Sequence, residues 1–188
     1  MSTAEDTRAA EFVAALVRLG EQEDRASLAA LRRSLGRELA DPAEAAAVFY
    51  RILPPVPEWA EADYWLAAGL FALHPAHRAG PDHGRPLAAE LRDLVAREPT
   101  TAAALERRFV ALLDAEREEL QVMLRSVVQL LRQHDQPLDH VQLIRDLQRW
   151  GSDWRGVQRR WARAFWRAGE PRVPDEAGKQ PPDLEVPP

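Results

Sequence analysis

Residues 100–131 read TTAAALERRFVALLDAEREELQVMLRSVVQLL and contain neither proline nor glycine, the residues that most often end a helix. Their apolar side chains recur at helical spacing, so we expect two helices that join near Asp114. One sector of the second helix is apolar and consists of Leu120, Leu124, Val127, Val128 and Leu131. The adjoining sector is polar and consists of Arg117, Gln121, Arg125, Gln129 and Arg132. This stretch therefore predicts amphipathic helices that carry arginines on their outer side.

Shorter helical segments lie on both sides of this stretch. Before it we expect five helices. The first carries Phe12, Leu16 and Leu19, and the second runs from a cap at Asp24 to about Leu39. The others run from Asp41-Pro42 to about Leu53, from about Glu58 to Leu73, and from Pro86 to no later than Pro99. After it we expect a helix that carries Val141, Ile144, Leu147 and Trp150, begun by the capping-box pair Asp139 and Gln142, and a last helix from Trp154 to Ala168.

The composition supports an all-α fold. Among 188 residues, Ala and Leu supply 56, whereas Ile supplies 2 and Thr 4, so helix formers far outnumber the β-branched residues that favour strands. We therefore predict about eight or nine helices in two packed helical bundles, over residues 1–98 and 99–170. Six prolines among the last 18 residues predict a disordered, proline-rich tail over residues 171–188.

The sequence gives little support for an enzyme. It has no cysteine, which excludes disulfides, thiolate metal sites and thiol nucleophiles, and it lacks the common nucleotide-binding, hydrolase and metalloprotease motifs. His74, His77 and His83 share one predicted surface loop, and we interpret them as solvated side chains. His134 and His140 flank a turn and are interpreted as surface or capping residues. We therefore expect no catalytic residue, no metal and no cofactor.

No apolar run is long enough to cross a membrane. A spanning helix needs about 18 or more consecutive apolar residues, and none occurs. The segment from Met1 to Asp6 is polar and acidic, unlike the start of a signal peptide. We therefore expect a cytoplasmic protein without a membrane partner.

The six tryptophans raise the question of base stacking, because single-stranded nucleic acid is often held on aromatic side chains. Helical spacing or apolar neighbours instead predict core positions for Trp59, Trp65, Trp150, Trp154 and Trp161. Trp166 lies off the apolar stripe of the last helix. We therefore do not expect an aromatic platform.

The net charge of −5 argues at first against nucleic acid as a partner. The charge is uneven, however: residues 1–124 hold 14 basic and 21 acidic residues, residues 125–170 hold nine and five, and residues 171–188 hold two and four. The middle segment includes a ladder of Arg155, Arg159 and Arg163. From composition alone, two roles for these arginines are equally well supported: binding a nucleic-acid backbone and binding another partner.

Several strings of the chain, taken in order, resemble the CasB family. They are LAALRRSLG (residues 28–36), AVFYRILPP (residues 47–55), ALERRFVALLDAEREEL (residues 104–120), LRSVVQLLRQ (residues 124–133), PLDHVQLIRDLQRW (residues 137–150) and VQRRWARAFW (residues 157–166). The resemblance covers about residues 10–167. Each string is common by itself, and the ordered set is specific.

The resemblance implies the non-catalytic small subunit of the type I-E CRISPR surveillance complex, Cascade, with an all-α fold of two bundles. The implied partners are the backbone, large and RNA-processing subunits, a second copy of the chain, the guide RNA and both strands of the target DNA. The implied role is to stabilise the R-loop, in which the guide RNA pairs with one DNA strand and displaces the other.

The resemblance also implies which arginines bind nucleic acid. They are Arg32, Arg33, Arg107, Arg108, Arg117, Arg125 and Arg145, with additional basic contacts expected at Arg51, Arg85, Arg132 and Arg149. The alternative is a helical scaffold or adaptor whose arginine face binds an acidic protein. Because the chain as a whole is acidic, we expect weak DNA binding by the isolated protein.

Overall fold

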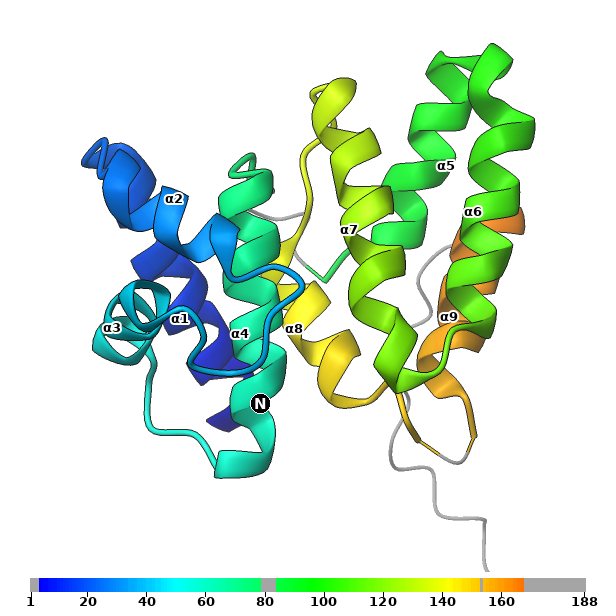
Figure 1. Cartoon of the computed structure of the whole chain (residues 1–188). Helices are drawn as coiled ribbons and strands as arrows, with labels where there is room; N and C mark the ends of the chain where they lie inside the picture. The colour runs from blue at the N-terminus through cyan, green and yellow to red at the C-terminus, as the bar shows by residue number, and fades with distance from the viewer. Residues whose placement is uncertain (1–3, 79–83, 153, 168–188) are drawn as a thin grey trace, which may run out of the picture.

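The structure, a computed structural model, describes residues 4–78, 84–152 and 154–167. These residues form α1 (Ala4–Glu21), α2 (Arg25–Arg33), α3 (Ala43–Ile52), α4 (Glu58–Leu73), α5 (Leu87–Arg97), a short 3-10 turn (Pro99–Thr101), α6 (Ala102–Asp114), α7 (Arg117–Gln133), α8 (His140–Gln148) and α9 (Gly156–Trp166) (Figure 1). The described residues contain no strand, only an isolated bridge between His77 and Leu138. The all-α prediction is confirmed, whereas the predicted tail lies outside the described residues.

Local sequence signals begin several helices where they were expected. The Asp24 carboxylate accepts a hydrogen bond from the Ser27 amide at 3.0 Å, and the Asp139 carboxylate accepts one from the Gln142 amide at 2.9 Å. Each bond satisfies a donor that the first turn of a helix leaves open. Pro57 precedes α4, which spans the predicted residues. These boundaries are local properties of the chain.

The end of α2 differs from the prediction, because the helix stops at Arg33 and not near Leu39. The backbone is left-handed at Gly36, with φ of 89°, which glycine adopts without steric cost. Just before this turn, Leu35 is buried against α4, where a Cβ added to Gly69 would lie 2.7 Å from Leu35 Cδ2. A local left-handed glycine and the packing of Leu35 on α4 thus coincide with the end of this helix.

The central helix of the core is α4, which packs against α2, α7 and α8. Its Tyr64 ring meets the ring of Phe12 from α1 edge to face, with 5.1 Å between centroids, and Phe12 meets Phe49 from α3 in the same way at 5.9 Å. Such aromatic pairs contribute about 0.5–1.5 kcal/mol each beyond the burial of their area. The N-terminal helices are thus fixed around α4.

The helices form two groups in space, with α1 to α4 on one side and α5, α6, α7 and α9 on the other (Figure 1). The short helix α8 packs against α1 and α4, while α5 packs against α9. The division at residues 98 and 99 stays a prediction. Helices from before it contact helices from after it, as α4 does with α8 and α5 with α9.

Candidate nucleic-acid interface

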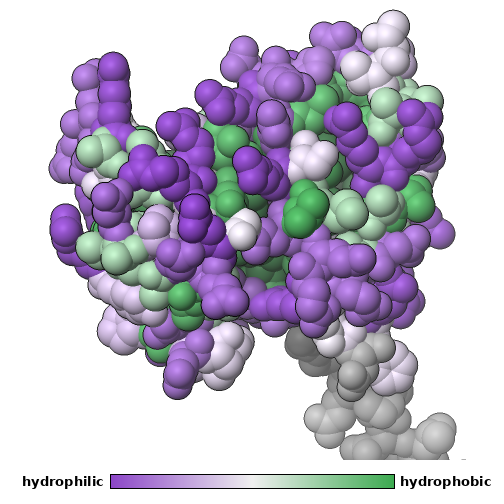
Figure 2. Space-filling model, viewed as in Figure 1, coloured by the Kyte–Doolittle hydropathy of each residue, from purple (hydrophilic) through white to green (hydrophobic). Residues whose placement is uncertain are grey.

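Exposed arginines that lack a side-chain partner in the described ranges lie on the pair of helices α6 and α7. They are Arg107 and Arg108 on α6 and Arg125 and Arg132 on α7, and none has a side-chain partner among the described residues. We call these four residues the outer arginine surface. The α6 arginines line a groove together with Met123 and Ser126 of α7. Hydrophilic residues cover most of this face of the molecule, and hydrophobic residues lie in the hollow between its two halves (Figure 2). Guanidinium groups that face water without a carboxylate are available to an anion.

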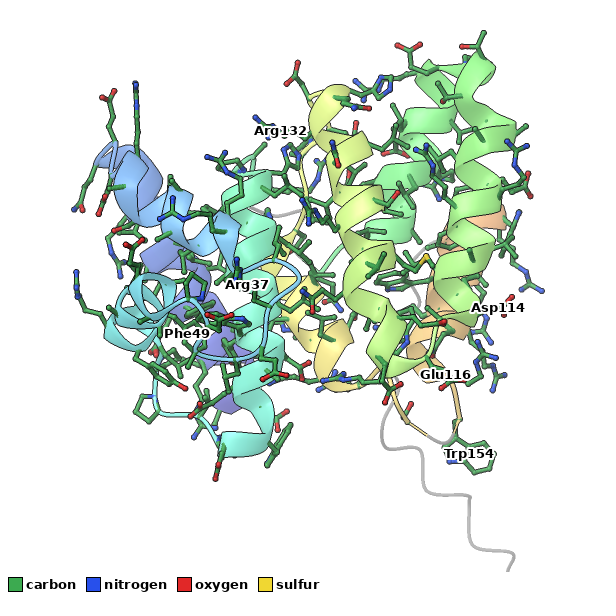
Figure 3. All side chains as sticks on the ribbon, viewed as in Figure 1. Arg37, Phe49, Asp114, Glu116, Arg132 and Trp154 are labelled. Carbon is green, nitrogen blue, oxygen red and sulfur yellow. The ribbon has the colours of Figure 1, made fainter. Side chains whose placement is uncertain are left out.

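A second groove lies between α4, α7 and the segment that joins α2 to α3. It is lined by Arg37, Leu39, Asp63, Arg117 and Gln121, among other residues. Arg37 was not among the predicted site residues, and its exposed side chain forms an ion pair of 3.1 Å with Asp41 (Figure 3). Only the early end of α2 brings this residue beside α7, so helical periodicity alone could not find it.

Arg117, a predicted contact for nucleic acid, forms an ion pair inside the protein. Its guanidinium pairs with Asp63 of α4, which is 3% exposed, and donates a hydrogen bond of 2.6 Å to the Leu147 carbonyl. Burial raises the pKa of Asp63, and the Arg117 charge offsets part of that rise. This arginine therefore joins α4, α7 and α8, and its role toward nucleic acid stays a prediction.

Three more predicted arginines also have acidic partners within the chain. Arg145 lies 2.8 Å from Asp6, and Arg149 lies 3.8 Å from Glu5, so both join α8 to α1. Arg85 pairs with Asp93 and, at 2.8 Å, with Glu90. Their guanidinium groups are thus less available to phosphate than those of the outer arginine surface.

The remaining predicted arginines lie on α2 and α3. Arg32 is exposed and has no side-chain partner among the described residues. Arg33 forms an ion pair of 2.8 Å with Glu44, in which both side chains are more than half exposed. Arg51 is exposed near the end of α3. Exposed ion pairs of this kind hold their arginines only weakly.

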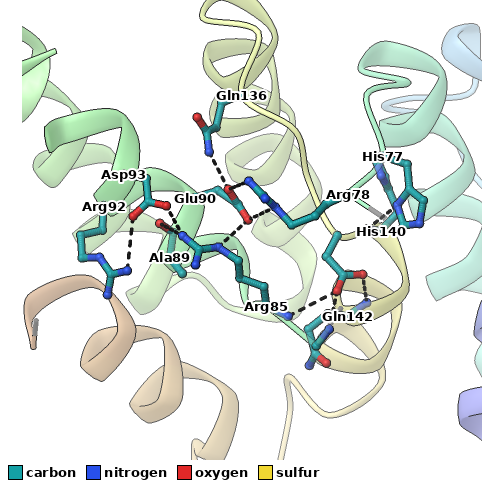
Figure 4. A network of polar contacts seen from close by, with 12 residues as sticks. His77, Arg78, Arg85, Ala89, Glu90, Arg92, Asp93, Gln136, His140 and Gln142 are labelled. Atoms are coloured by element: carbon teal, nitrogen blue, oxygen red, sulfur yellow. Dashed lines mark hydrogen bonds and ion pairs between the residues drawn. The ribbon is translucent and has the colours of Figure 1, made fainter. Parts of the chain in front are cut away.

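A buried polar network connects the start of α5 to the turn between α7 and α8 (Figure 4). The Glu90 carboxylate is fully buried and accepts hydrogen bonds from Arg78 at 2.8 and 2.9 Å, from Arg85 at 2.8 Å and from the Gln136 amide at 2.6 Å. Three donor groups thus surround one carboxylate, which is what a buried charge requires. The network fixes the segment after α4 against the second group of helices.

Predictions for His74 and His140 are wrong, because both side chains are buried, while His77 is half-buried. His74 is 4% exposed, and its Nε2 lies 2.7 Å from the Gln136 carbonyl. His140 is 1% exposed beside Phe71 and His77, and burial lowers its pKa to about 3. The interpretation of His140 as a surface or capping residue is therefore wrong, while His83 lies outside the described residues.

The tryptophans divide into two kinds. Trp65, Trp150 and Trp161 are buried, as predicted. Trp59 and Trp154 are 64% and 81% exposed, so their predicted core positions are wrong. For Trp154 the reason is local, since α9 begins at Gly156 and leaves the tryptophan outside the apolar stripe of that helix.

Within the described residues, no group of three or more His, Asp or Glu side chains is placed to hold a metal ion. None of the helices described is long and apolar enough to cross a membrane. The fold and its surface thus define a class: an all-α protein with a set of exposed arginines that have no partner in the part of the chain that the structure describes.

Comparison with known proteins identifies the family. The model of the family described as CRISPR-associated protein Cse2 matches residues 27–166. The chain therefore belongs to the Cse2 family, whose solved members also carry the name CasB. The resemblance to the CasB family is confirmed.

The similarity extends to individual relatives and structures. A CRISPR-associated protein Cse2 from Thermus thermophilus is 38% identical over 108 residues, which are 56% of this chain and 57% of that protein. The crystal structure of a Cse2-family protein from Thermus thermophilus has a TM-score of 0.69 and 31% identity, and the match covers 84% of this chain and 97% of that chain. A chain of a CRISPR RNA-guided surveillance complex has a TM-score of 0.70 and 28% identity, with coverage of 86% and 92%.

Proposed function

We propose that this chain is the non-catalytic small subunit of a type I-E CRISPR surveillance complex, where it holds target and displaced DNA strands through arginine–phosphate contacts. The observation that carries the proposal is the outer arginine surface, whose four arginines have no partner among the described residues. The similarity to a chain of a CRISPR RNA-guided surveillance complex supports the assembly with other subunits and guide RNA. A second copy of the chain as a partner is part of the proposal and rests on the family resemblance.

The energetics of R-loop formation give such a subunit a role without any catalysis. An RNA–DNA hybrid is about as stable as the DNA duplex that it replaces, so base pairing alone leaves the exchange nearly balanced. Additional contacts to the sugar–phosphate backbone then shift the balance toward the open state. Arginine suits this task because its planar guanidinium binds phosphate without reading the base sequence.

Double variants that each remove two positive charges test the proposal. Arg107→Gln with Arg108→Gln, and Arg125→Gln with Arg132→Gln, are assembled with the other subunits and guide RNA, and target affinity is measured at several salt concentrations. We expect weaker R-loop formation on every target sequence, and a salt dependence that is shallower by about 0.7–0.9 in log–log slope for each phosphate that an arginine no longer neutralises.

The matched control is Arg18→Gln with Arg25→Gln. These two arginines are also exposed and unpaired among the described residues. They lie at the end of α1 and the start of α2, in the group of helices opposite the one that contains α6 (Figure 1). We expect this control to retain wild-type affinity and salt slope. Unchanged binding by both outer-surface variants, in complexes that assemble normally, would contradict the proposal and favour an acidic protein partner.

A further inference from the structure

The segment between α8 and α9 presents a tryptophan to solvent. Trp154 is 81% exposed and projects away from the helices (Figure 3). The next residue, Arg155, has left-handed backbone angles, φ 46° and ψ 41°, which non-glycine residues seldom adopt. Its guanidinium donates a hydrogen bond of 2.5 Å to the Leu113 carbonyl at the end of α6. The protein therefore holds this turn in place while leaving the indole ring in water.

The exposed ring borders a groove between the end of α6 and the start of α9. Leu113, Trp154 and Ala162 supply apolar lining, while Arg155 and Arg159 supply charge. The carboxylate of Asp114 also lines the groove, where it lies 3.8 Å from Arg155 and is 74% exposed. A flat aromatic face thus lies beside cationic groups at the edge of a shallow apolar groove.

The stretch of chain that follows Trp154 is positively charged, although the acidic Asp153 directly precedes it in the sequence. Residues 154–167 include Arg155, Arg159, Arg160, Arg163 and Arg167 and no acidic residue. Arg160 is bound to Asp146, but Arg159 and Arg163 have no side-chain partner among the described residues. They lie four residues apart on exposed positions of α9, so they follow one side of the helix away from Trp154.

The other strongly exposed tryptophan, Trp59, lies in the opposite environment. It is 64% exposed at the start of α4, between the acidic residues Glu58 and Glu61. The nearby Tyr50 hydroxyl donates a hydrogen bond of 3.0 Å to Glu61. The carboxylates there would repel a chain of phosphates. Both tryptophans have an exposed indole ring, so what distinguishes the Trp154 surface from the Trp59 surface is its arginines.

We propose that Trp154, Arg159 and Arg163 form a binding site for single-stranded nucleic acid, in which a base stacks on the indole ring and the adjacent phosphates contact the two guanidinium groups. Proteins that hold single strands combine stacking aromatics with a positively charged path in this way. The inference rests on the proposed function for the class of partner, and it adds a second contact surface apart from the outer arginine surface. Its ligand is an unpaired strand, because bases inside a duplex do not expose their faces.

The first test measures binding of a fluorescein-labelled single-stranded thymidine oligonucleotide to the full chain at low salt. Trp154→Leu is expected to weaken binding about 5- to 150-fold, the range for loss of one stacked base, and Trp154→Phe to recover much of that loss. Arg159→Gln with Arg163→Gln is expected to weaken binding and to reduce its salt dependence. Trp59→Leu, the matched control, is expected to bind as the wild type does. Because Trp154 is exposed, unfolding midpoints should not change.

Two outcomes would overturn the inference. One is unchanged oligonucleotide binding by Trp154→Leu and by the Arg159/Arg163 variant, and the other is binding by Trp154→Phe that is as weak as binding by Trp154→Leu, which would exclude stacking. Unchanged oligonucleotide binding combined with poor incorporation of Trp154→Leu into the surveillance complex would assign the surface to a protein partner instead. The proposed function is judged separately, because it depends on the outer arginine surface and on R-loop formation by the assembled complex.

Discussion

Two groups of arginines in this protein differ in what surrounds them. Arginines at the seams between helices are bound to buried or half-buried carboxylates, in the pairs Arg117–Asp63, Arg160–Asp146, Arg78–Glu90 and Arg85–Glu90. The four of the outer arginine surface have no carboxylate partner among the described residues. The same residue type thus stabilises the fold in one region and remains available to a ligand in the other.

A negative net charge does not by itself prevent one surface of a protein from binding an anion. The net charge of −5 counts paired and unpaired groups alike, although a carboxylate bound to an arginine contributes little field at a distance. At the seams, acids and arginines largely cancel each other. The local charge of the outer surface, rather than the total, therefore decides whether a nucleic-acid strand can bind there.

The largest expected difference between the regions is in their response to acid. Burial holds the pKa of His140 at about 3, below its ordinary value of 6.5, and burial also lowers the pKa of His77. The neutral imidazole therefore contributes fully to stability above about pH 6.5, and this contribution is lost as the pH falls toward 3. The loss reaches about 4 kcal/mol. No histidine belongs to the outer arginine surface, so this effect is confined to the buried region around His140.

His140→Leu isolates this effect. Neither ring nitrogen of His140 has a hydrogen-bond partner in the described part of the chain, so leucine should preserve stability at pH 7. The free energy of unfolding, measured by urea titration between pH 7 and pH 4, should fall less steeply for the variant than for the wild type. The raised pKa values of Asp63 and Asp146 act in the opposite direction, but both proteins share them. Parallel pH profiles would contradict a buried neutral imidazole.

The next largest effect is expected at Asp146, the carboxylate that joins α8 to α9. It is 1% exposed and pairs with Arg160, while its oxygens accept hydrogen bonds from the Trp161 indole at 2.5 Å and from the Gln142 amide at 2.6 Å. Asp146→Ala leaves these donors without an acceptor and should cost about 3 kcal/mol in urea unfolding at pH 7.

The control for Asp146 is Asp114→Ala, which removes an equal charge from an exposed pair. Asp114 is 74% exposed and lies 3.8 Å from Arg155, so its loss should not measurably change the unfolding midpoint. Equal losses of stability in the two variants would contradict this prediction. They would show that the contribution of a carboxylate to stability does not depend on whether it lies between helices or on the surface.

Much of the fold could be predicted from the sequence because helix boundaries depend largely on local residues. The apolar spacing from Glu58 to Leu73 placed α4 correctly, and Asp139 correctly marked the start of α8. The end of α2 was missed because the apolar spacing was followed past Gly36, where a left-handed backbone and the packing of Leu35 against Gly69, distant in sequence, both mark the end of the helix. Where a helix ends through tertiary packing, periodicity continues past the true boundary.

The candidate site was less predictable, for the same reason. Periodicity placed Arg117 on one stripe with Arg125 and Arg132, but the partner of Arg117 is Asp63, 54 residues earlier in the chain. The sequence likewise placed Trp154 in a helix that begins only at Gly156. Which side chains are free is a property of contacts between distant segments, and composition does not record it.

The smallest expected effect on stability is that of Arg117→Ala, which is compared with the separate variant Arg33→Ala. This pair of variants is also the sharpest test of the two groups of arginines. Arg117 is 43% exposed, so solvent already screens its pairing with Asp63, and we expect a cost of only about 1–2 kcal/mol in urea unfolding. Without this arginine the pKa of Asp63 should rise further, because burial remains and the offsetting charge is gone.

Arg33, whose pairing with Glu44 is exposed, should give no measurable change in stability when replaced by alanine. The decisive measurement is target binding by complexes assembled with each variant. If Arg117→Ala keeps wild-type stability but weakens R-loop formation as the outer-surface variants do, Arg117 belongs with the ligand-binding arginines, as its place in the sequence predicts. If it loses stability and binds DNA normally once assembled, its pairing with Asp63 defines it as a residue of the fold.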